Sequence, residues 1–182
     1  EQFLGRELSG ATVGLVGFGR IGQRVAELLT GFDCNIVFAD AQPMEDVAAW
    51  YRAERMELAE LLAVSDFVSL HVNLTPETKH MINARTLARC KPGAILVNTC
   101  RGAVVDTAAL VDALRDGPLA AAGLDVYENE PEVPEELVKL PNTVLVPHIG
   151  SATRATRDAM ATLCADNVIA VLSGEEPPTP VV

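Results

Sequence analysis

Short apolar runs rich in valine, isoleucine and leucine alternate along the chain with stretches whose apolar residues fall at helical spacing. Runs of this length and composition are typical of strands buried on both faces. The alternation therefore predicts an α/β fold, a doubly wound parallel sheet with helices covering both faces. The predicted strands are residues 12–17, 35–39, 67–70, 94–98, 121–126 and 143–146.

Helices are predicted between these strands and after the last one. Three of them span residues 21–30, 58–64 and 107–115, with Gly31 and Gly117 as C-terminal stops. A longer helix at 152–172 follows the final strand, and the Pro-rich residues 175–182 are expected to be extended. Periodicity shows which face of this long helix is apolar but not what covers it. The apolar stripe is therefore expected to pack either on the edge of the same domain or against a second domain or subunit. The stripe consists of Met160, Leu163, Cys164, Asn167, Val168, Val171 and Leu172.

Composition narrows the class of protein. The chain has 182 residues, of which 49% are hydrophobic, enough for one well-packed domain. Its formal charge of −11 would repel nucleic acid and anionic membrane surfaces. The four cysteines form no C-x-x-C pair, so neither a metal site nor a disulfide framework is expected, and a reducing, cytoplasmic setting fits best. No apolar run approaches the roughly 18 residues that would span a bilayer.

A glycine-rich segment, GFGRIG at residues 17–22, follows the first predicted strand and opens a helix. This is the context in which G-x-G-x-x-G binds a dinucleotide. Gly17 would permit the tight turn, Gly19 would let the backbone approach a pyrophosphate, and Gly22 would let the helix pack closely on the strand. Methyltransferases and plain glycine turns share the pattern, so the segment alone does not identify the ligand.

Asp40 ends the second predicted strand, about 20 residues after the glycine segment, where a ribose-binding acid is expected. Alone it would be interpreted as a solvated acid in a turn, but its place in the order of elements favours the ribose. A carboxylate there would repel a 2′-phosphate by on the order of 1 to 4 kcal/mol at an intermediate dielectric. The predicted cofactor is therefore NAD rather than NADP.

Four further segments are more specific: KPGAILVNTCRGAVVD at 91–106, GLDVYENEP at 123–131, PHIGSAT at 147–153 and LHVNLTPET at 70–78. With the glycine segment they resemble the NAD-binding domain of the D-isomer-specific 2-hydroxyacid dehydrogenases, over essentially the whole chain. HMIN at 80–83, IGSAT at 149–153 and GEEPP at 174–178 are most similar to the glyoxylate and hydroxypyruvate reductases, and phosphoglycerate dehydrogenase shares most of the rest. The resemblance implies a Rossmann-type fold and hydride transfer between NAD(H) and a small D-2-hydroxy acid or its 2-oxo acid.

The resemblance also implies a catalytic set of Arg101, Glu130 and His148. Arg101 would hold the carboxylate and carbonyl of the substrate with its planar fork. His148 would donate a proton to the carbonyl oxygen as hydride reaches the adjacent carbon, and Glu130 would hydrogen-bond the imidazole and favour its protonated form. The implied cofactor contacts, beyond the three glycines and Asp40, are Arg20, Ile21, Val72, Thr99, Cys100, Asp125 and Gly150.

Three side chains near these motifs have competing interpretations. His71 is expected in the core or lining the cofactor, and His80 in a turn or on the surface. Cys100 beside Arg101 could have a lowered pKa and react with alkylating agents, although a small buried thiol that fills space is favoured. Cys100 and Asn73 also depart from the residues usual in the family.

The resemblance implies that residues 1–150 form the NAD-binding domain and that the helix and tail at 151–182 would cross back to a substrate domain. Full-length members of the family begin with a region that forms most of that second domain. Because this chain starts just ahead of the first predicted strand, we expect that region to be absent. We then expect a fragment that binds NAD and turns over weakly or not at all.

The expected partners are a small 2-oxo or 2-hydroxy acid and a second copy of the chain, as a homodimer. An alternative is an NAD-sensing regulator, because corepressors on this fold keep the Arg, Glu and His. The acidic charge and the lack of interaction tails disfavour that alternative. A methyltransferase is disfavoured because its chemistry does not require an Arg, a Glu and a His at three strand ends.

Overall fold

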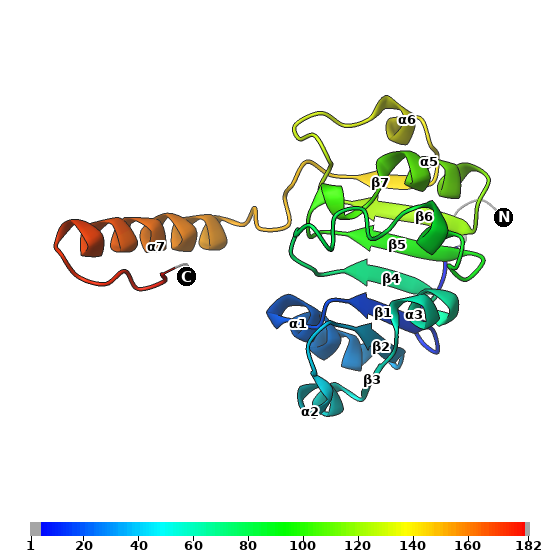
Figure 1. Ribbon diagram of the computed structural model, residues 1–182, viewed down its shortest axis with the longest axis horizontal. Helices are drawn as coiled ribbons and strands as arrows, with labels where there is room; N and C mark the ends of the chain where they lie inside the picture. The colour runs from blue at the N-terminus through cyan, green and yellow to red at the C-terminus, as the bar shows by residue number, and fades with distance from the viewer. Residues whose placement is uncertain (1–4, 181–182) are drawn as a thin grey trace. The chain divides into compact units, whose positions relative to one another are not determined.

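The apolar runs form the strands of one parallel sheet (Figure 1). The computed structural model describes residues 5–180 and divides into two units, Glu1–Pro147 and His148–Val182. All strands lie in the first unit, in the order β3-β2-β1-β4-β5-β6-β7, and every neighbouring pair is parallel. The strands are β1 (Thr12–Val16), β2 (Asn35–Ala39), β3 (Ala53–Arg55), β4 (Phe67–Leu70), β5 (Ala94–Asn98), β6 (Leu119–Leu124) and β7 (Thr143–Leu145). The strand order reverses between β1 and β4, which places a topological switch point at the carboxyl ends of these two strands.

In the described part of the chain, six helices lie between successive strands and a seventh follows the last strand. They are α1 (Arg20–Leu29), α2 (Glu45–Ala48), α3 (Leu58–Val64), α4 (Ala84–Leu87), α5 (Thr107–Arg115), α6 (Glu135–Val138) and α7 (Arg154–Leu172). Single 3₁₀ turns occur at Thr30–Phe32, Ala49–Tyr51 and Gly102–Val104. Within residues 5–180 no helix combines the length and the apolar character needed to cross a membrane.

Two hydrophobic cores lie on opposite faces of the sheet. The larger one joins α3, α4, α5 and α6 to the sheet through buried side chains such as Leu61, Leu87 and Leu110. The smaller one joins α1 and α2 to β1 and β2, with Phe38 and Ala26 fully buried. Alternation along β1 and β2 sends successive side chains to these two cores.

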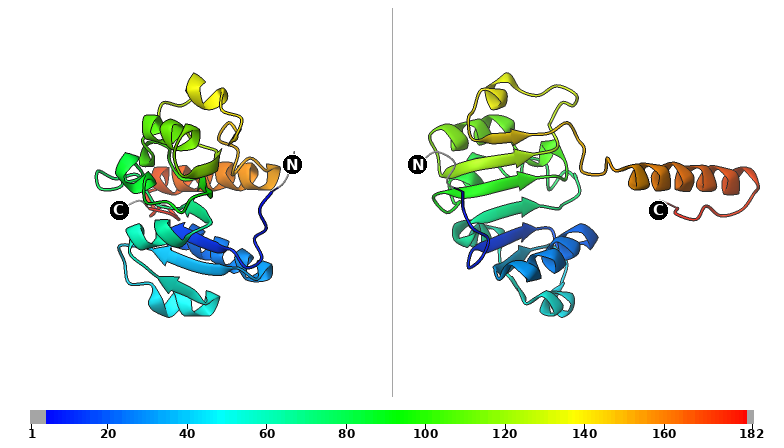
Figure 2. Two further views of the ribbon diagram at one scale, coloured as in Figure 1. Left: turned by 90° about the vertical axis from the view of Figure 1, so that its right-hand side faces the viewer. Right: turned by 180° about the vertical axis from the view of Figure 1, so that it is seen from behind.

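The smaller core covers only part of its face. Seen from behind in Figure 2, β4 to β7 have no helix of the first unit in front of them. The side chains on that face of β4 to β6 are partly exposed, and Val144 on β7 is 68% exposed. Helical cover of both faces, as the sequence predicts, is therefore complete only over β1 and β2, since Glu54 and Arg55 of the edge strand β3 are exposed.

The sequence predicts six of the seven strands but neither β3 nor the four-residue helices α2, α4 and α6. β6 begins two residues earlier than expected, at Leu119. Gly31 lies inside a 3₁₀ turn, and Asp33 (φ 52°) takes the left-handed position after it. A Cβ at Gly117 would lie 2.6 Å from the Ala113 Cα, so the close approach of the two backbones requires a glycine there.

The second unit consists of α7 and the residues that flank it. Thr153 caps α7 by accepting a hydrogen bond from the Thr156 N–H (3.2 Å). The predicted stripe of this helix is largely exposed, and Ala170 is the buried residue of the helix. The tail folds back on the helix, where the Asn167 amide donates to Thr179 Oγ1 (2.8 Å) and accepts from the Thr179 N–H (3.0 Å). Residues 181–182 of the predicted tail lie outside the described part.

Candidate active site

The glycine segment forms a tight turn between β1 and α1. Gly17 has φ 94°, and a Cβ there would lie 2.6 Å from the His71 carbonyl oxygen. A Cβ at Gly22 would collide with the carbonyl oxygen of Gly17, so the helix approaches the loop as closely as two backbones allow. Gly19, the N-cap of α1, has no atom within 4 Å of the same position. The start of α1 is therefore open on its Gly19 side, and the cap has no side chain to occupy the first-turn N–H groups.

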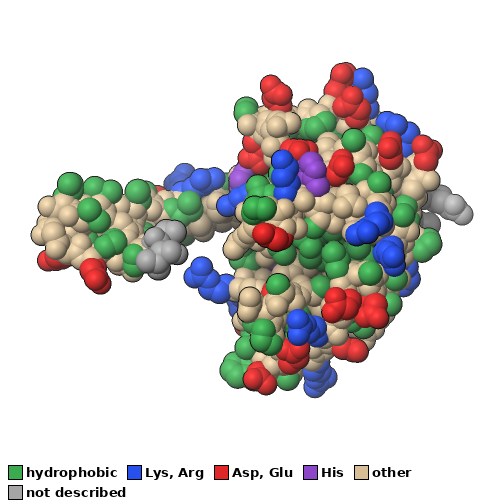
Figure 3. All heavy atoms as spheres, viewed as in Figure 1, with side chains coloured by type: hydrophobic (Ala, Val, Ile, Leu, Met, Phe, Trp, Pro, Cys, Tyr) green, Lys and Arg blue, Asp and Glu red, His purple; other side chains and the backbone are tan. Residues whose placement is uncertain are grey.

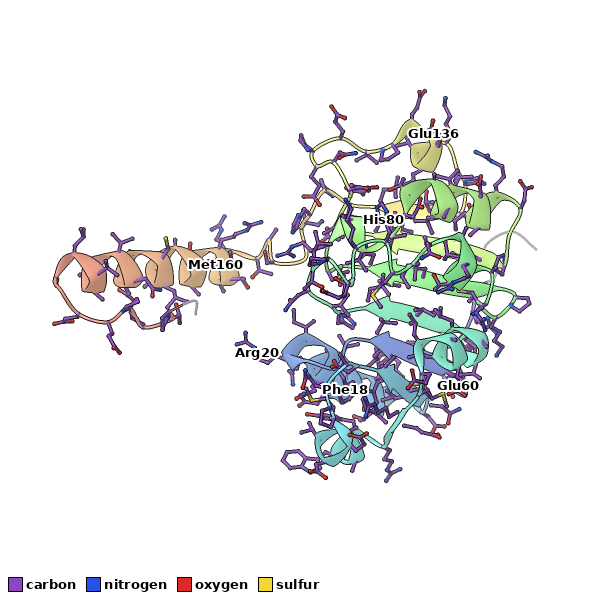
Figure 4. The ribbon with its side chains drawn as sticks, viewed as in Figure 1. Phe18, Arg20, Glu60, His80, Glu136 and Met160 are labelled. Carbon is purple, nitrogen blue, oxygen red and sulfur yellow. The ribbon has the colours of Figure 1, made fainter. Side chains whose placement is uncertain are left out.

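Side chains of the same loop point in opposite directions. Phe18 is fully buried and stacks on Phe38 with ring centroids 4.3 Å apart, which fixes the turn to the sheet. Arg20 is exposed and projects from the first turn of α1 (Figure 4), and Ile21 is 68% exposed. An anion at this helix end would thus meet backbone N–H groups and one guanidinium.

Asp40 reaches the glycine loop from the end of β2. Its Oδ2 accepts a hydrogen bond from the Phe18 N–H (2.6 Å), and its Oδ1 accepts one from the Gln42 N–H (2.8 Å). Each carboxylate oxygen has a further lone pair for a hydroxyl group. The carboxylate therefore stabilises the glycine loop and remains able to accept from a ribose beside it.

Asn98 organises the loop that follows β5. This side chain is buried; its Oδ1 accepts from the Cys100 N–H (3.1 Å), and its Nδ2 donates to the Arg101 carbonyl (3.0 Å). Thr99 and Arg101 are exposed, and the Arg101 guanidinium donates to the Cys100 carbonyl (2.6 Å). No motif in the sequence points to Asn98, although a polar residue that ends an apolar run is a signal for such a role.

Cys100 is a partly buried thiol rather than an activated one. Burial raises the pKa of the Cys100 thiol, and the neighbouring backbone N–H groups and the charge of Arg101 offset only part of that effect. The thiol also lies 3.1 Å from Asn98 Oδ1, to which it donates. Desolvation of the thiolate outweighs the nearby guanidinium, so the alternative of a lowered pKa is wrong, and the raised pKa agrees with the space-filling interpretation that the sequence favours.

The loop after β6 carries the predicted Asp125 and Glu130. Asp125 is buried, and its N–H donates to the Asn98 carbonyl (3.0 Å), which joins this loop to the one after β5. Glu130 Oε1 accepts from the Tyr127 N–H (3.0 Å). The Tyr127 hydroxyl donates to the carbonyls of Leu124 (3.2 Å) and Val146 (3.0 Å), which fixes the loop between β6 and β7.

His71 and Val72 follow β4 and stand against the glycine loop. His71 is partly buried, and burial lowers the pKa of its imidazole, which favours the neutral form. A Cβ added at Gly17 would lie 3.0 Å from the Val72 side chain. Both residues thus lie just beyond the carboxyl end of β4, which pairs with β1 at the switch point of the sheet.

The remaining predicted residues, His148 and Gly150, belong to the second unit. His148 has a left-handed backbone (φ 54°) immediately after Pro147. No group of three or more histidine, cysteine, aspartate or glutamate side chains suited to a metal ion occurs among the described residues. On the face shown in Figure 3, acidic and basic side chains of the first unit are interspersed, and the basic ones form no continuous stripe.

A doubly wound parallel sheet with this loop, this acid and this switch point defines a dinucleotide-binding domain. The open position at Gly19 and the carboxylate at Asp40 fit a pyrophosphate and a ribose. The sequence model described as "D-isomer specific 2-hydroxyacid dehydrogenase, NAD binding domain" matches residues 1–150. The chain belongs to this family and carries its NAD-binding domain.

Individual relatives agree with this assignment. The glyoxylate reductase of Thermococcus litoralis is 52% identical over 177 residues, which cover 97% of this chain and 54% of that protein. Among solved structures, the TT0316 protein of Thermus thermophilus is 50% identical with a TM-score of 0.92, over 100% of this chain and 57% of that one. An NADPH-dependent glyoxylate/hydroxypyruvate reductase of Sinorhizobium meliloti, solved with NADP and malonate, is 41% identical with a TM-score of 0.90, over 97% of this chain and 54% of that one. The chain therefore spans about half the length of these relatives.

Proposed function

We propose that the protein transfers a hydride between NAD(H) and a small D-2-hydroxy acid or its 2-oxo acid, with glyoxylate or hydroxypyruvate as the substrate. One observation carries the proposal: the glycine loop with Asp40 and the loops bearing Arg101 and Glu130 all follow strands at the carboxyl edge of one parallel sheet. Ligands of open α/β sheets bind at that edge. The relatives named as glyoxylate reductases support the choice of substrate.

Arg101 is the proposed anchor of the substrate. Its backbone carbonyl is held by buried Asn98, while its side chain is exposed. A planar guanidinium makes two parallel hydrogen bonds to a carboxylate, and it holds a 2-oxo acid in one orientation. Rigid attachment of the loop reduces the entropy that has to be lost when the substrate is positioned.

His148 and Glu130 are the proposed proton-transfer pair. The bound cofactor supplies the hydride for C2 of the 2-oxo acid. His148 donates the proton that the carbonyl oxygen requires, and in the reverse direction it takes the proton back. Glu130 favours the protonated imidazole and fixes its tautomer.

The same proposal assigns roles to the rest of the chain. The pyrophosphate is assigned to Gly17, Gly19, Arg20, Ile21 and Gly22. The ribose is assigned to Asp40, which disfavours a ribose that carries a 2′-phosphate. The adenosine side and the nicotinamide end are assigned to Val72, Thr99, Cys100, Asp125 and Gly150. Residues 151–182 are assigned to contacts with a substrate domain. We also propose that the protein is cytoplasmic and forms a homodimer. The partly exposed face of β4 to β7 supports the homodimer, because a second copy could cover it.

The test uses the full-length product of the gene, assayed for NADH oxidation with glyoxylate and with hydroxypyruvate. Arg101→Lys keeps the charge and removes the fork, so we expect kcat/KM to fall by about a hundredfold. The Kd for NADH should stay within about twofold of the unsubstituted protein, because the substitution leaves the fold and the glycine loop intact.

Arg115→Lys is the matched control, since Arg115 is an exposed arginine on α5, remote from the carboxyl edge. Two outcomes would refute the proposal. One is an unsubstituted protein that oxidises NADH with neither acid. The other is an Arg101→Lys variant as active as Arg115→Lys.

A further inference from the structure

His80 and Glu128 form a side-chain contact between two loops of the carboxyl edge. His80 lies in the loop after β4, with a left-handed backbone (φ 50°), and Glu128 lies in the loop after β6. The imidazole Nε2 is 2.8 Å from Glu128 Oε1, and the Thr107 hydroxyl is 3.4 Å from Glu128 Oε2. Both side chains are partly exposed, His80 at 36% and Glu128 at 27%. Figure 4 labels His80 in this region of the first unit.

The backbone around His80 is joined to the segment that follows Arg101. The His80 N–H donates to the Ala103 carbonyl (2.9 Å), and the Ile82 N–H donates to the Val104 carbonyl (3.2 Å). In return, the Asp106 N–H donates to the Ile82 carbonyl (2.8 Å). The loop after β4 therefore holds the 3₁₀ turn that begins one residue after Arg101.

That 3₁₀ turn is packed directly on the backbone that precedes Glu130. A Cβ at Gly102 would collide with the peptide between Tyr127 and Glu128. Two residues further along, Glu130 accepts from the Tyr127 N–H. His80, through its backbone on one side and its imidazole on the other, thus touches the segments that carry both of the first unit's proposed catalytic residues.

We propose that His80 and Glu128 are a positioning pair that sets the distance between Arg101 and Glu130. The proposal rests on the function proposed above, because it assigns the pair to that same reaction. His80 holds the loop after β6 through its contact with Glu128. Glu130, two residues later, is the carboxylate proposed to act on His148. Misplacement of a catalytic group by 1 Å costs up to about a hundredfold in rate, so a contact of this kind has a kinetic effect larger than its effect on folding.

The alternative is an ordinary surface ion pair. Such pairs contribute little to stability when both side chains are partly solvated, and their removal does not change turnover. A positioning role and an ion pair without function therefore differ in kcat and not in the midpoint of unfolding.

The experiment compares His80→Ala, Glu128→Ala and the double variant in the full-length product of the gene. We expect each single substitution to lower kcat by about tenfold, with the Kd for NADH within about twofold and a nearly unchanged midpoint of thermal unfolding. The double variant should lose no more than either single one, because the two side chains act through one contact. Glu128→Gln should recover most of the activity, since its amide oxygen still accepts from the imidazole N–H.

Glu135→Ala is the matched control, because Glu135 forms an exposed ion pair with Lys139 (2.7 Å) on α6. Amide hydrogen exchange of residues 127–130 is measured on the same samples, and it should speed up in His80→Ala and not in the control. Unchanged exchange, a kcat equal to that of the control, or losses in the single variants that multiply in the double one would each overturn the proposal. If the unsubstituted protein shows no hydride transfer, the proposed function fails, and hydrogen exchange still decides whether His80 holds the Glu128 segment.

Discussion

Asp40 is proposed to serve two functions with one carboxylate. It accepts hydrogen bonds from the Phe18 and Gln42 N–H groups, and it stands where a ribose would lie. A charged acceptor of a backbone N–H contributes about 1.5 to 3 kcal/mol, so its loss also loosens the glycine loop. Cofactor choice and loop order are therefore coupled at this residue.

Asp40→Ala is predicted to weaken NADH binding by about tenfold or more and to abolish the preference for NADH over NADPH. Both effects follow from loss of the two backbone contacts and of the charge that repels a 2′-phosphate. Titration of each cofactor by calorimetry measures them. Glu60→Ala, on an exposed carboxylate of α3, serves as control and should leave both Kd values unchanged. An Asp40→Ala variant that kept its selectivity would remove Asp40 from the ribose site.

Two glycines of one loop are predicted to respond differently to alanine. Gly22→Ala places a methyl group against the Gly17 carbonyl and should destabilise the fold by about 1 to 3 kcal/mol. Gly19→Ala meets open space at φ −70°, so it should leave the free energy of unfolding within about 0.5 kcal/mol and weaken NADH binding. Urea unfolding and cofactor titration separate the two effects. Equal loss of stability in both variants would contradict the assigned geometry.

At the scale of elements, Asp66 ties together three segments at the amino edge of the sheet. Its carboxylate accepts from the Thr12 N–H (2.9 Å) and pairs with Arg6 (2.5 Å) and Lys91 (2.6 Å). Burial alone would raise the pKa of the Asp66 carboxyl, but the Lys91 hydrogen bond, the Thr12 N–H and the charge of Arg6 outweigh it, and the pKa is lowered. The ionised form is thus favoured by folding.

A lowered pKa in the folded state stabilises the protein above the pKa of the unfolded chain, near about 4, and the contribution is lost as the pH falls through the lowered value. Asp66→Asn is therefore predicted to cost about 1 to 3 kcal/mol at neutral pH. The difference from the unsubstituted protein should shrink as the medium is made more acidic than the unfolded pKa. Urea unfolding at a series of pH values measures this difference. A difference that does not depend on pH would show that the Asp66 charge is not what stabilises these segments.

The long elements were predictable because their apolar residues repeat over enough positions to show a period. β3 was not, since its residues Ala53, Glu54 and Arg55 form no apolar run and the strand exists only by pairing with β2. Four-residue helices such as α4 make only about one turn, so their apolar residues show no repeat. Asn83 caps α4 through a capping box. The sequence motifs point to Asp40, Arg101 and Glu130, whereas the partnership of His80 with Glu128 has no local pattern. Contacts between loops of different strands depend on the register of the whole sheet.

At the scale of the whole molecule, the chain is a cofactor platform that covers about half the length of its relatives. The glycine loop, Asp40 and the loops after β5 and β6 are all within the first unit. The residues assigned to the pyrophosphate and the ribose therefore all lie in one unit, whereas the proposed proton transfer uses His148 and the proposed cofactor site also includes Gly150, both in the second unit.

The most direct measurement is calorimetric titration of this chain with NADH and, separately, with NADPH, alongside a circular dichroism check that the sample is folded. We predict that NADH binds, and that NADPH binds about ten to a thousandfold more weakly, because the Asp40 carboxylate repels the 2′-phosphate. A folded sample that binds neither dinucleotide, or that binds NADPH as tightly as NADH, would contradict it.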